Sequence, residues 1–382
     1  MIAPHRHFHR LAWIAVLLAF GIVVFGAFVR LSNAGLSCPD WPTCYGRAAW
    51  PQAQHEIANH AATAIRPLEP HKAWREQLHR MLAGTLGVLV LTLALLAARR
   101  RKHGIGLIAV AAVLVAYSVS LYMHAHYVPA AVLAALGEGL LLALAARWSN
   151  ADLARAATLT LAVIVFQALL GMWTVTWLLK PIVVMGHLLG GLTTFALLTW
   201  MAWRATDLPL RLPDARRLRR LLIVGLVLLG VQVALGGWTS ANYAALACGT
   251  DFPKCVGQWW PPHDFGEGFV LWRDAFLGHG GVDYEGGVLT GASRIAIQLA
   301  HRMMAGVVFA YLLWLAARLL RTPGVRGSGA LLAVLACAQV ALGIANVKLA
   351  LPLPVAVLHN AGAALLLFVL IGLAARVRAP EA

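Results

Sequence analysis

Two His-Arg pairs near the starts of long apolar runs are the residues of this chain with the clearest capacity for chemistry. His79 lies in Arg75-Glu76-Gln77-Leu78-His79-Arg80, and His301 lies in Gln298-Leu299-Ala300-His301-Arg302. Each histidine falls about one turn inside a predicted membrane helix, where an imidazole needs a polar partner. Neutral imidazole is also a good axial ligand of haem iron. His79 and His301 are therefore candidate iron ligands, with a hydrogen bond to a neighbouring helix as the alternative.

A second histidine occupies a matching place in each half of the chain. Gln167-Ala168-Leu169-Leu170-Gly171 matches Gln339-Val340-Ala341-Leu342-Gly343, and a histidine follows each glutamine after 20 residues, at His187 and His359. Two imidazoles on antiparallel helices can bind both faces of one porphyrin, whereas zinc needs three or four ligands at one point. Bis-histidine haem is the interpretation that fits. Gly190, Gly191 and Gly362 would leave room for the macrocycle, or would pack helices.

The two copies differ at the position three residues before the first histidine. Glu76 stands there in the first copy and Gln298 in the second, each on the helix face of its histidine. This difference predicts that the sites have diverged, one performing acid/base or cation-stabilising chemistry and the other holding a cofactor. The alternative is that Glu76 is a helix-entrance charge, paired with Arg75 or Arg80 and stabilised by the helix dipole.

Four cysteines also follow the repeat. Cys38-Pro39-Asp40-Trp41-Pro42-Thr43-Cys44 matches the segment from Cys248 to Cys255, which carries one inserted residue. Both segments lie in predicted outer loops, so they predict two disulfides, Cys38–Cys44 and Cys248–Cys255, in an oxidising compartment. A redox relay through these cysteines is the alternative.

The composition predicts a membrane-embedded scaffold for these residues. Of the 382 residues 60% are hydrophobic and only 12% are charged, with a mean hydropathy of +0.75, whereas soluble domains contain about 25% charged residues. The net charge of +16 arises mainly from lysines and arginines in short loops, which the positive-inside rule places in the cytoplasm. The basicity therefore indicates topology, with both termini cytoplasmic and lipid as the surroundings, and excludes nucleic acid as the expected partner.

Apolar runs long enough to cross a bilayer predict about ten helices. Their ranges are 11–29, 74–98, 104–123, 128–146, 157–178, 182–203, 221–239, 293–317, 328–348 and 354–375. Two long outer loops follow the first and the seventh helix. The remaining histidines, among them His5 and His279, fall in predicted loops and at helix ends, where solvation is expected.

The repeat predicts an all-α fold of two parallel-repeated four-helix bundles related by a pseudo-twofold axis along the membrane normal. The first bundle covers residues 1–203, a cytoplasmic linker covers 204–220, and the second bundle covers 221–382. The two histidines lie further apart in the first half than in the second, by about one helical hairpin. Residues 104–147 are therefore predicted to be a peripheral insertion in the first bundle.

These features together resemble the haem A synthase family of haem O oxygenases. The resemblance rests on the repeated bundles, the Glu-x-x-His-Arg segment, one histidine on each of two helices per half, and the loop cysteines. It implies an oxidoreductase of the bacterial inner membrane that oxidises the C8 methyl of haem O to a formyl group by successive hydroxylations, for cytochrome oxidase assembly. It further implies that His301 and His359 hold a haem b cofactor. The substrate haem would then bind at His79 and His187, with Glu76 as the catalytic residue.

The resemblance also points to partners and leaves a second class of function open. A haem O synthase, cytochrome oxidase assembly factors and further copies of the chain are candidate partners, and the sequence does not identify the electron donor. The alternative function is a bis-histidine membrane cytochrome b that transfers electrons from quinol without modifying haem. Such cytochromes commonly place two histidines on each of two helices, whereas here four helices carry one each. A parallel-repeat transporter is a third and weaker alternative.

Overall fold

The computed structural model describes residues 7–57, 60–273 and 282–380. In these residues ten helices are long and apolar enough to cross a membrane, which makes the chain a multi-pass membrane protein. They are α1 Phe8–Leu31, α2 Pro70–Ala98, α3 Gly104–Met123, α4 Tyr127–Arg147, α5 Ala154–Thr176, α6 Pro181–Thr206, α7 Ala215–Ala241, α9 Gly291–Leu320, α10 Arg326–Lys348 and α11 Leu353–Arg376. His5 and His279 lie outside the described residues.

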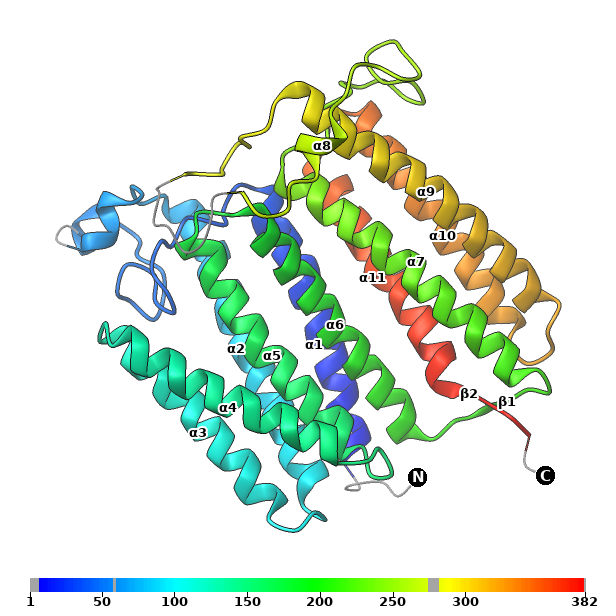
Figure 1. The fold of residues 1–382 in the computed structure, drawn as a ribbon, viewed down its shortest axis with the longest axis horizontal. Coiled ribbons are helices and arrows are strands. Elements are labelled where there is room, and N and C mark those ends of the chain that lie inside the picture. The colour runs from blue at the N-terminus through cyan, green and yellow to red at the C-terminus, as the bar shows by residue number, and fades with distance from the viewer. Residues whose placement is uncertain (1–6, 58–59, 274–281, 381–382) are drawn as a thin grey trace.

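The helices pack in two groups that meet along a central seam (Figure 1). In the first group α1 packs against α2 and α6, and α5 packs against α2 and α6. In the second group α9 packs against α7 and α10, and α11 packs against α7 and α10. The seam is formed by α1 and α6 on one side and by α7 and α11 on the other. Each group has its own cluster of buried apolar side chains.

Helices α3 and α4 form a hairpin at one edge of the molecule (Figure 1). They pack against each other, with α3 on α2 and α4 on α5. Gly137 of α4 permits their close approach, because an added Cβ would lie 2.9 Å from the Val115 side chain and 3.1 Å from the carbonyl oxygen of Ala111. Residues 104–147 therefore lie beside the other helices of the first group, as expected for a peripheral hairpin.

Two helices begin earlier than their apolar runs predict. Helix α2 begins at Pro70, because proline fits the first turn of a helix, where its missing N–H has no intrahelical partner. Helix α7 begins at Ala215, so most of the arginine-rich segment predicted as linker is helical. Long arginine side chains allow this, since their charged groups reach water from a partly buried backbone. The segment between α6 and α7 is accordingly only 207–214.

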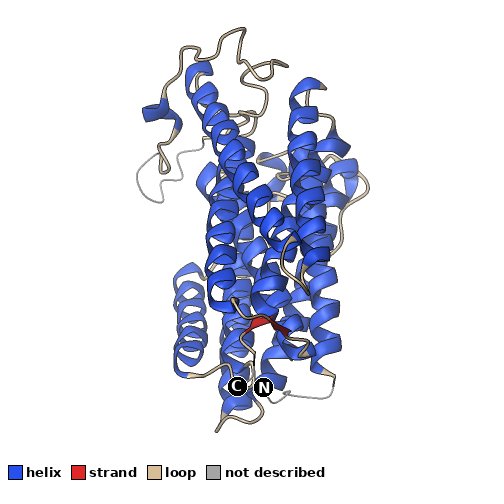
Figure 2. Ribbon diagram, turned by 90° about the vertical axis from the view of Figure 1, so that its right-hand side faces the viewer, coloured by secondary structure: helices blue, strands red, loops and turns tan. Residues whose placement is uncertain are grey.

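A short parallel strand pair joins the two halves near the chain termini (Figure 2). Strand β1, Leu210–Arg211, pairs with β2, Val377–Arg378, and Leu210 lies opposite Val377. Arg378 also forms an ion pair with Asp207 at 2.9 Å. The segment that follows the first helix group is thereby fixed to the end of the last helix. Two-residue strands are too short to show a periodicity, so no pattern in the sequence predicts them.

The opposite end of the molecule carries the two long loops, 32–69 and 242–290, and we call it the loop end (Figure 1). Its short helices are the 3-10 helices Gln54–Ile57 and Ala61–Ala64 and the helix α8, Phe265–Gly268. Arg66 of the first loop forms ion pairs with Asp283 at 2.5 Å and Glu285 at 2.7 Å in the second. The two halves are thus connected by ion pairs at the loop end and by the strand pair near the termini.

Candidate functional site

Each of the four predicted histidines lies against a glycine on a neighbouring helix. A Cβ added at the glycine would lie 2.9 to 3.2 Å from the Cε1 atom of the histidine, so a larger residue there would displace the imidazole. The pairs are Gly26 of α1 with His79 of α2, Gly171 of α5 with His187 of α6, Gly236 of α7 with His301 of α9, and Gly343 of α10 with His359 of α11. Both halves therefore position both of their histidines in the same way, with each imidazole packed against a glycine of the neighbouring helix.

The histidines associate in two pairs, one in each half. His79 lies within electrostatic range of His187, and His301 lies within range of His359. The Nδ1 atoms of His79, His187 and His359 are buried and have no hydrogen-bond partner. Among the described residues no group of three or more His, Cys, Asp or Glu side chains is placed to hold a metal ion by itself. Two imidazoles do suit haem, since the porphyrin supplies the other iron ligands.

A glutamine on the adjacent helix fixes the backbone at the second histidine of each pair. The Gln167 Nε2 donates to the carbonyl oxygen of His187 at 2.6 Å, and the Gln339 Nε2 donates to that of His359 at 3.0 Å. This contact explains the 20-residue spacing, because the glutamine and the histidine lie opposite each other on antiparallel helices.

The same contact accounts for the glycines that follow these histidines. A Cβ at Gly190 would lie 2.1 Å from Oε1 of Gln167, and a Cβ at Gly362 would lie 2.2 Å from Oε1 of Gln339. Nε2 of Gln167 likewise lies 3.4 Å from an added Cβ at Gly191. These glycines therefore accommodate the glutamine amides of the adjacent helix, which agrees with the helix-packing alternative.

The first histidines of the two pairs have different surroundings. Nε2 of Gln232 on α7 lies 3.2 Å from Nδ1 of His301, within hydrogen-bond distance. Gln232 stands four residues before Gly236, and the residue four before Gly26 is Ile22, which has no polar side chain. The ring of His301 therefore has an amide partner that the ring of His79 lacks. Sequence analysis missed Gln232, although its difference from Ile22 can be seen once α1 and α7 are aligned on their glycines.

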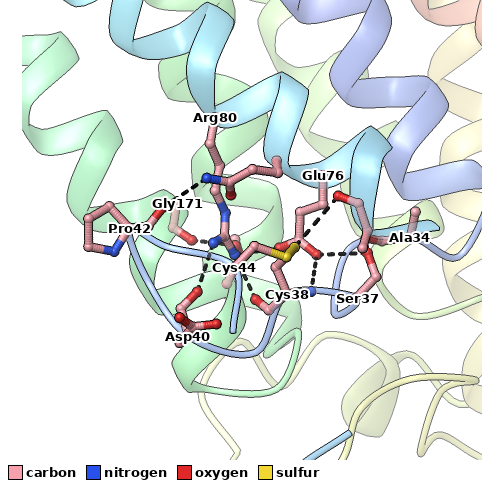
Figure 3. A network of polar contacts seen from close by, with 12 residues as sticks. Ala34, Ser37, Cys38, Asp40, Pro42, Cys44, Glu76, Arg80 and Gly171 are labelled. Atoms are coloured by element: carbon pink, nitrogen blue, oxygen red, sulfur yellow. Dashed lines mark hydrogen bonds and ion pairs between the residues drawn. A yellow bond between two sulfur atoms is a disulfide. The ribbon is translucent and has the colours of Figure 1, made fainter. Parts of the chain in front are cut away.

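Glu76 points towards the first cysteine loop (Figure 3). Its Oε2 accepts hydrogen bonds from the Ser37 hydroxyl at 3.0 Å and from the Cys38 N–H at 2.9 Å. Its Oε1 forms an ion pair with Arg80 at 2.6 Å, and only 7% of the Glu76 side chain is exposed. The carboxylate is thus buried and bound to groups of the chain itself. One of them is Arg80, the partner expected if Glu76 were only a helix-entrance charge. The catalytic role assigned to Glu76 stays a prediction.

Both cysteine pairs form disulfides, and an arginine next to each first histidine holds the loop that contains them. The bonds join Cys38 to Cys44 and Cys248 to Cys255. Arg80 donates to the carbonyl oxygens of Cys38, Asp40 and Thr43 at 2.8, 2.7 and 2.6 Å. Arg302 donates to those of Asp251 and Lys254, each at 3.0 Å. The His-Arg repeat therefore combines a candidate ligand with a loop anchor.

An aspartate closes each disulfide loop from inside. The N–H of Gly46 donates to Asp40 at 2.8 Å, and the N–H of Gly257 donates to Asp251 at 2.6 Å. Burial acts to raise the pKa of Asp40, but hydrogen bonds from Thr43, Gly46 and Tyr45 outweigh it, so the pKa lies below its usual value. The second loop has no counterpart of Glu76, since the Oε1 of Gln298 is buried without a partner. The first loop is therefore tied to its helix by a charge that the second loop lacks.

The hairpin of α3 and α4 places its own polar residues away from the histidine pairs. His124 and His126 are exposed at the hairpin turn, and the Nδ1 of His124 lies 2.8 Å from the carbonyl oxygen of Ser120. Glu138 of α4 has a buried Oε2 without a partner, and we have no physical account of this acid.

The chain is a multi-pass membrane protein of two packed helix groups, each with a histidine pair near a disulfide loop. Comparison with known proteins shows its family. The chain belongs to the COX15-CtaA family, described as cytochrome oxidase assembly protein, which it matches over residues 9–121 and 120–371.

Named relatives agree with this assignment. The chain is 36% identical to the heme A synthase of Shewanella oneidensis over 95% of both chains. It is 28% identical to the heme A synthase of Caulobacter vibrioides, over 96% of this chain and 95% of the relative. The similarity to the heme A synthase of Rhizorhabdus wittichii is also 28%, over 94% of this chain and 90% of the relative. The comparisons favour the haem A synthase interpretation, an oxidoreductase, over the electron-carrying cytochrome.

Proposed function

We propose that this chain oxidises the C8 methyl of haem O to a formyl group, as a haem A synthase. The observation that carries the proposal is the four-fold His-Gly contact, which produces one pair of part-buried imidazoles in each half. Cytochromes b of the alternative class commonly place their histidines two on each of two helices, whereas here four helices carry one each. Two pairs in one chain suit an enzyme that binds a substrate haem and a resident haem together, which agrees with the family and with the names of the relatives.

The two halves divide these roles in our proposal. His301 and His359 hold haem b, and His79 and His187 receive haem O. The amide of Gln232 supports this division, because a histidine that binds a metal usually forms a hydrogen bond through its other ring nitrogen, which fixes the ring and strengthens binding. Rotation of the Gln232 amide by half a turn would bring its Oε1, which has no partner, to the Nδ1 of His301, where it could accept a hydrogen bond from an Nδ1–H. Bis-histidine haem b bound there would supply electron transfer. His79 has no such partner, as suits a haem that must be released as product.

Glu76 acts in the substrate half by holding the Cys38–Cys44 loop to α2. Its hydrogen bonds to Ser37 and Cys38 occupy one carboxylate oxygen and Arg80 occupies the other, so the contacts favour a positioning role. The buried negative charge also remains in the substrate half, where oxidation of a methyl group develops positive character on carbon. Gln298 offers the other half no such charge.

The setting of the enzyme follows from the same proposal. The lysines and arginines of the short loops support a topology with both termini in the cytoplasm of a bacterial cell, and the loop end would then lie on the oxidising side, where disulfides persist. A haem O synthase would deliver the substrate, and cytochrome oxidase assembly factors would receive the product. Copies of the chain are candidate partners within the bilayer.

Extraction and mass identification of the haems in the purified protein test the function. We expect haem B together with haem O or haem A, and conversion of added haem O when electrons are supplied. Haem B alone, with no conversion of haem O, would support the cytochrome instead.

Single ligand variants test the division of roles. We expect His301→Ala and His359→Ala to lose the haem b spectrum, and His79→Ala to keep that spectrum while losing haem O. The reverse pattern would show that the two halves have the opposite roles.

A further inference from the structure

Two arginines lie one helical turn from the contact between Gly26 and His79, on its loop-end side. Helix α1 runs towards the loop end, and Arg30 follows Gly26 by four residues. Helix α2 runs away from it, and Arg75 precedes His79 by four residues. Residues four apart share a helix face at about 5 to 6 Å between Cβ atoms. Because Gly26 and His79 are in contact, the two arginines occupy adjacent turns of neighbouring helices at one level.

Neither arginine forms an ion pair with an acid among the described residues. The guanidinium of Arg75 lies 5.1 Å from the ring centre of Phe28 and 5.8 Å from that of Trp74. Arg30 donates to the Ser240 carbonyl oxygen at 2.8 Å and to the Tyr243 hydroxyl at 3.2 Å, and it lies over the Tyr243 ring. The Nε atoms of both arginines are buried without a partner. Glu76, which adjoins Arg75, is bound by Arg80 instead.

The second half has no cation at either matched position. The residue four after Gly236 is Ser240, and the residue four before His301 is Ile297. A third position agrees, since Lys180 stands seven residues before His187 and Pro352 stands seven before His359. The two halves share their histidines, glycines and disulfides, so the cations at these three positions distinguish the first half from the second. Unpaired guanidinium groups on adjacent turns repel each other, and an anion between them would remove that cost.

We propose that Arg75 and Arg30 bind the propionate carboxylates of the substrate haem, which rests on the proposed function of the His79 and His187 pair. Guanidinium is a planar donor fork that matches the two oxygens of a carboxylate, and haem carries its carboxylates on one edge of the porphyrin. That edge would face the loop end. The C8 methyl shares its pyrrole ring with one propionate, so binding of the propionate edge holds that ring near the two arginines. The arginines thereby present the two methyl groups beside the propionates, C8 among them, and not those on the far edge of the porphyrin.

Binding of haem O and of its dimethyl ester, in which both propionates are blocked, tests the proposal on the full-length protein. The dissociation constants are measured by titration of the Soret band. We expect the wild type to bind haem O at least about tenfold more tightly than the ester, which is about 1.4 kcal/mol. Arg75→Gln should weaken the binding of haem O about tenfold and leave that of the ester unchanged. Arg75→Lys should recover part of the loss.

Lys72→Gln is the matched control, because it removes one positive charge from the same end of α2 and Lys72 is paired with Glu69 at 2.9 Å. It should bind both ligands as the wild type does. Equal weakening of haem O and ester by Arg75→Gln, or no weakening of either, would overturn the proposal. Haem A formation by the wild type is recorded separately. If the wild type makes haem A but Arg75→Gln still prefers haem O to the ester as strongly as the wild type does, only the carboxylate site is rejected. If the preference for haem O depends on Arg75 but the wild type makes no haem A, only the proposed function is rejected.

Discussion

Replacement of Glu76 by glutamine should detach the first disulfide loop from α2 while leaving the second loop in place. The carboxylate accepts from Ser37 and Cys38 and pairs with Arg80, whose side chain is only 13% exposed. An amide of the same shape keeps one acceptor but turns an N–H group towards donors, and it leaves Arg80 without its counter-charge. Loss of one partner of a buried pair costs about 3 to 5 kcal/mol. The lower value corresponds to an increase of about a hundredfold in the detached population of the loop.

The two disulfides of one chain provide the assay and its control. In Glu76→Gln, a mild reductant followed by alkylation and mass spectrometry should modify Cys38 and Cys44 far faster than in the wild type. Cys248 and Cys255 should react at the wild-type rate, because Arg302 holds their loop without an acid. The variant should retain the haem b spectrum and accumulate haem O or its hydroxylated product in place of haem A. Unchanged reactivity of Cys38 together with normal haem A output would refute the positioning role of Glu76.

Three further outcomes are expected. Gln232→Leu should keep haem b but shift its reduction potential and low-spin spectrum, because His301 loses a ring hydrogen bond. Ile22→Leu, the matched change in the other half, should shift neither. An unshifted potential in Gln232→Leu would remove the argument that the second half holds the resident haem. Deletion of residues 104–147 should leave the haem spectrum intact, since the helices that the hairpin packs against are α2 and α5 and its further contact is between Tyr122 and Trp41 of the first loop; an iron ligand at His124 or His126 would contradict it. Asp40→Asn should speed reduction of the first disulfide at neutral pH. Because the pKa of Asp40 is lower in the folded chain than its ordinary value of 3.8, the carboxylate stabilises the loop fully above pH 3.8, and this stabilisation is lost as the pH falls through the folded-state pKa. In strong acid a phosphine should therefore reduce the disulfide of the wild type and of the variant at the same rate.

The sequence predicted the parts of this structure that repeat. The ten apolar runs became ten helices in the described residues, and the matched Cys38 and Cys248 segments became two disulfide loops. A repeated pattern predicts structure well because both copies must fold into the same arrangement of helices and loops. The first turn of α2 was missed because His71 and Lys72 are polar, although a helix can begin in the interfacial region.

What the sequence did not predict were contacts between helices. Gly26 is one of 35 glycines, and nothing local distinguishes it until α1 is placed against His79. Gln232 is matched by Ile22 in the other half, so the repeat pattern does not mark it as a site residue. Gly190 left two interpretations open because a small residue near a histidine looks the same in sequence whether a macrocycle or the Gln167 amide lies against it.

The connections between the two halves bear on how a substrate as large as haem O enters and leaves. Arg66 joins the halves at the loop end, and the pairing of β1 with β2 joins them near the termini. Rocking of one half against the other would have to break these contacts together with the packing of α1 and α6 on α7 and α11. Exchange of substrate and product would then run sideways between helices, from the bilayer itself, in which a lipophilic haem is already dissolved.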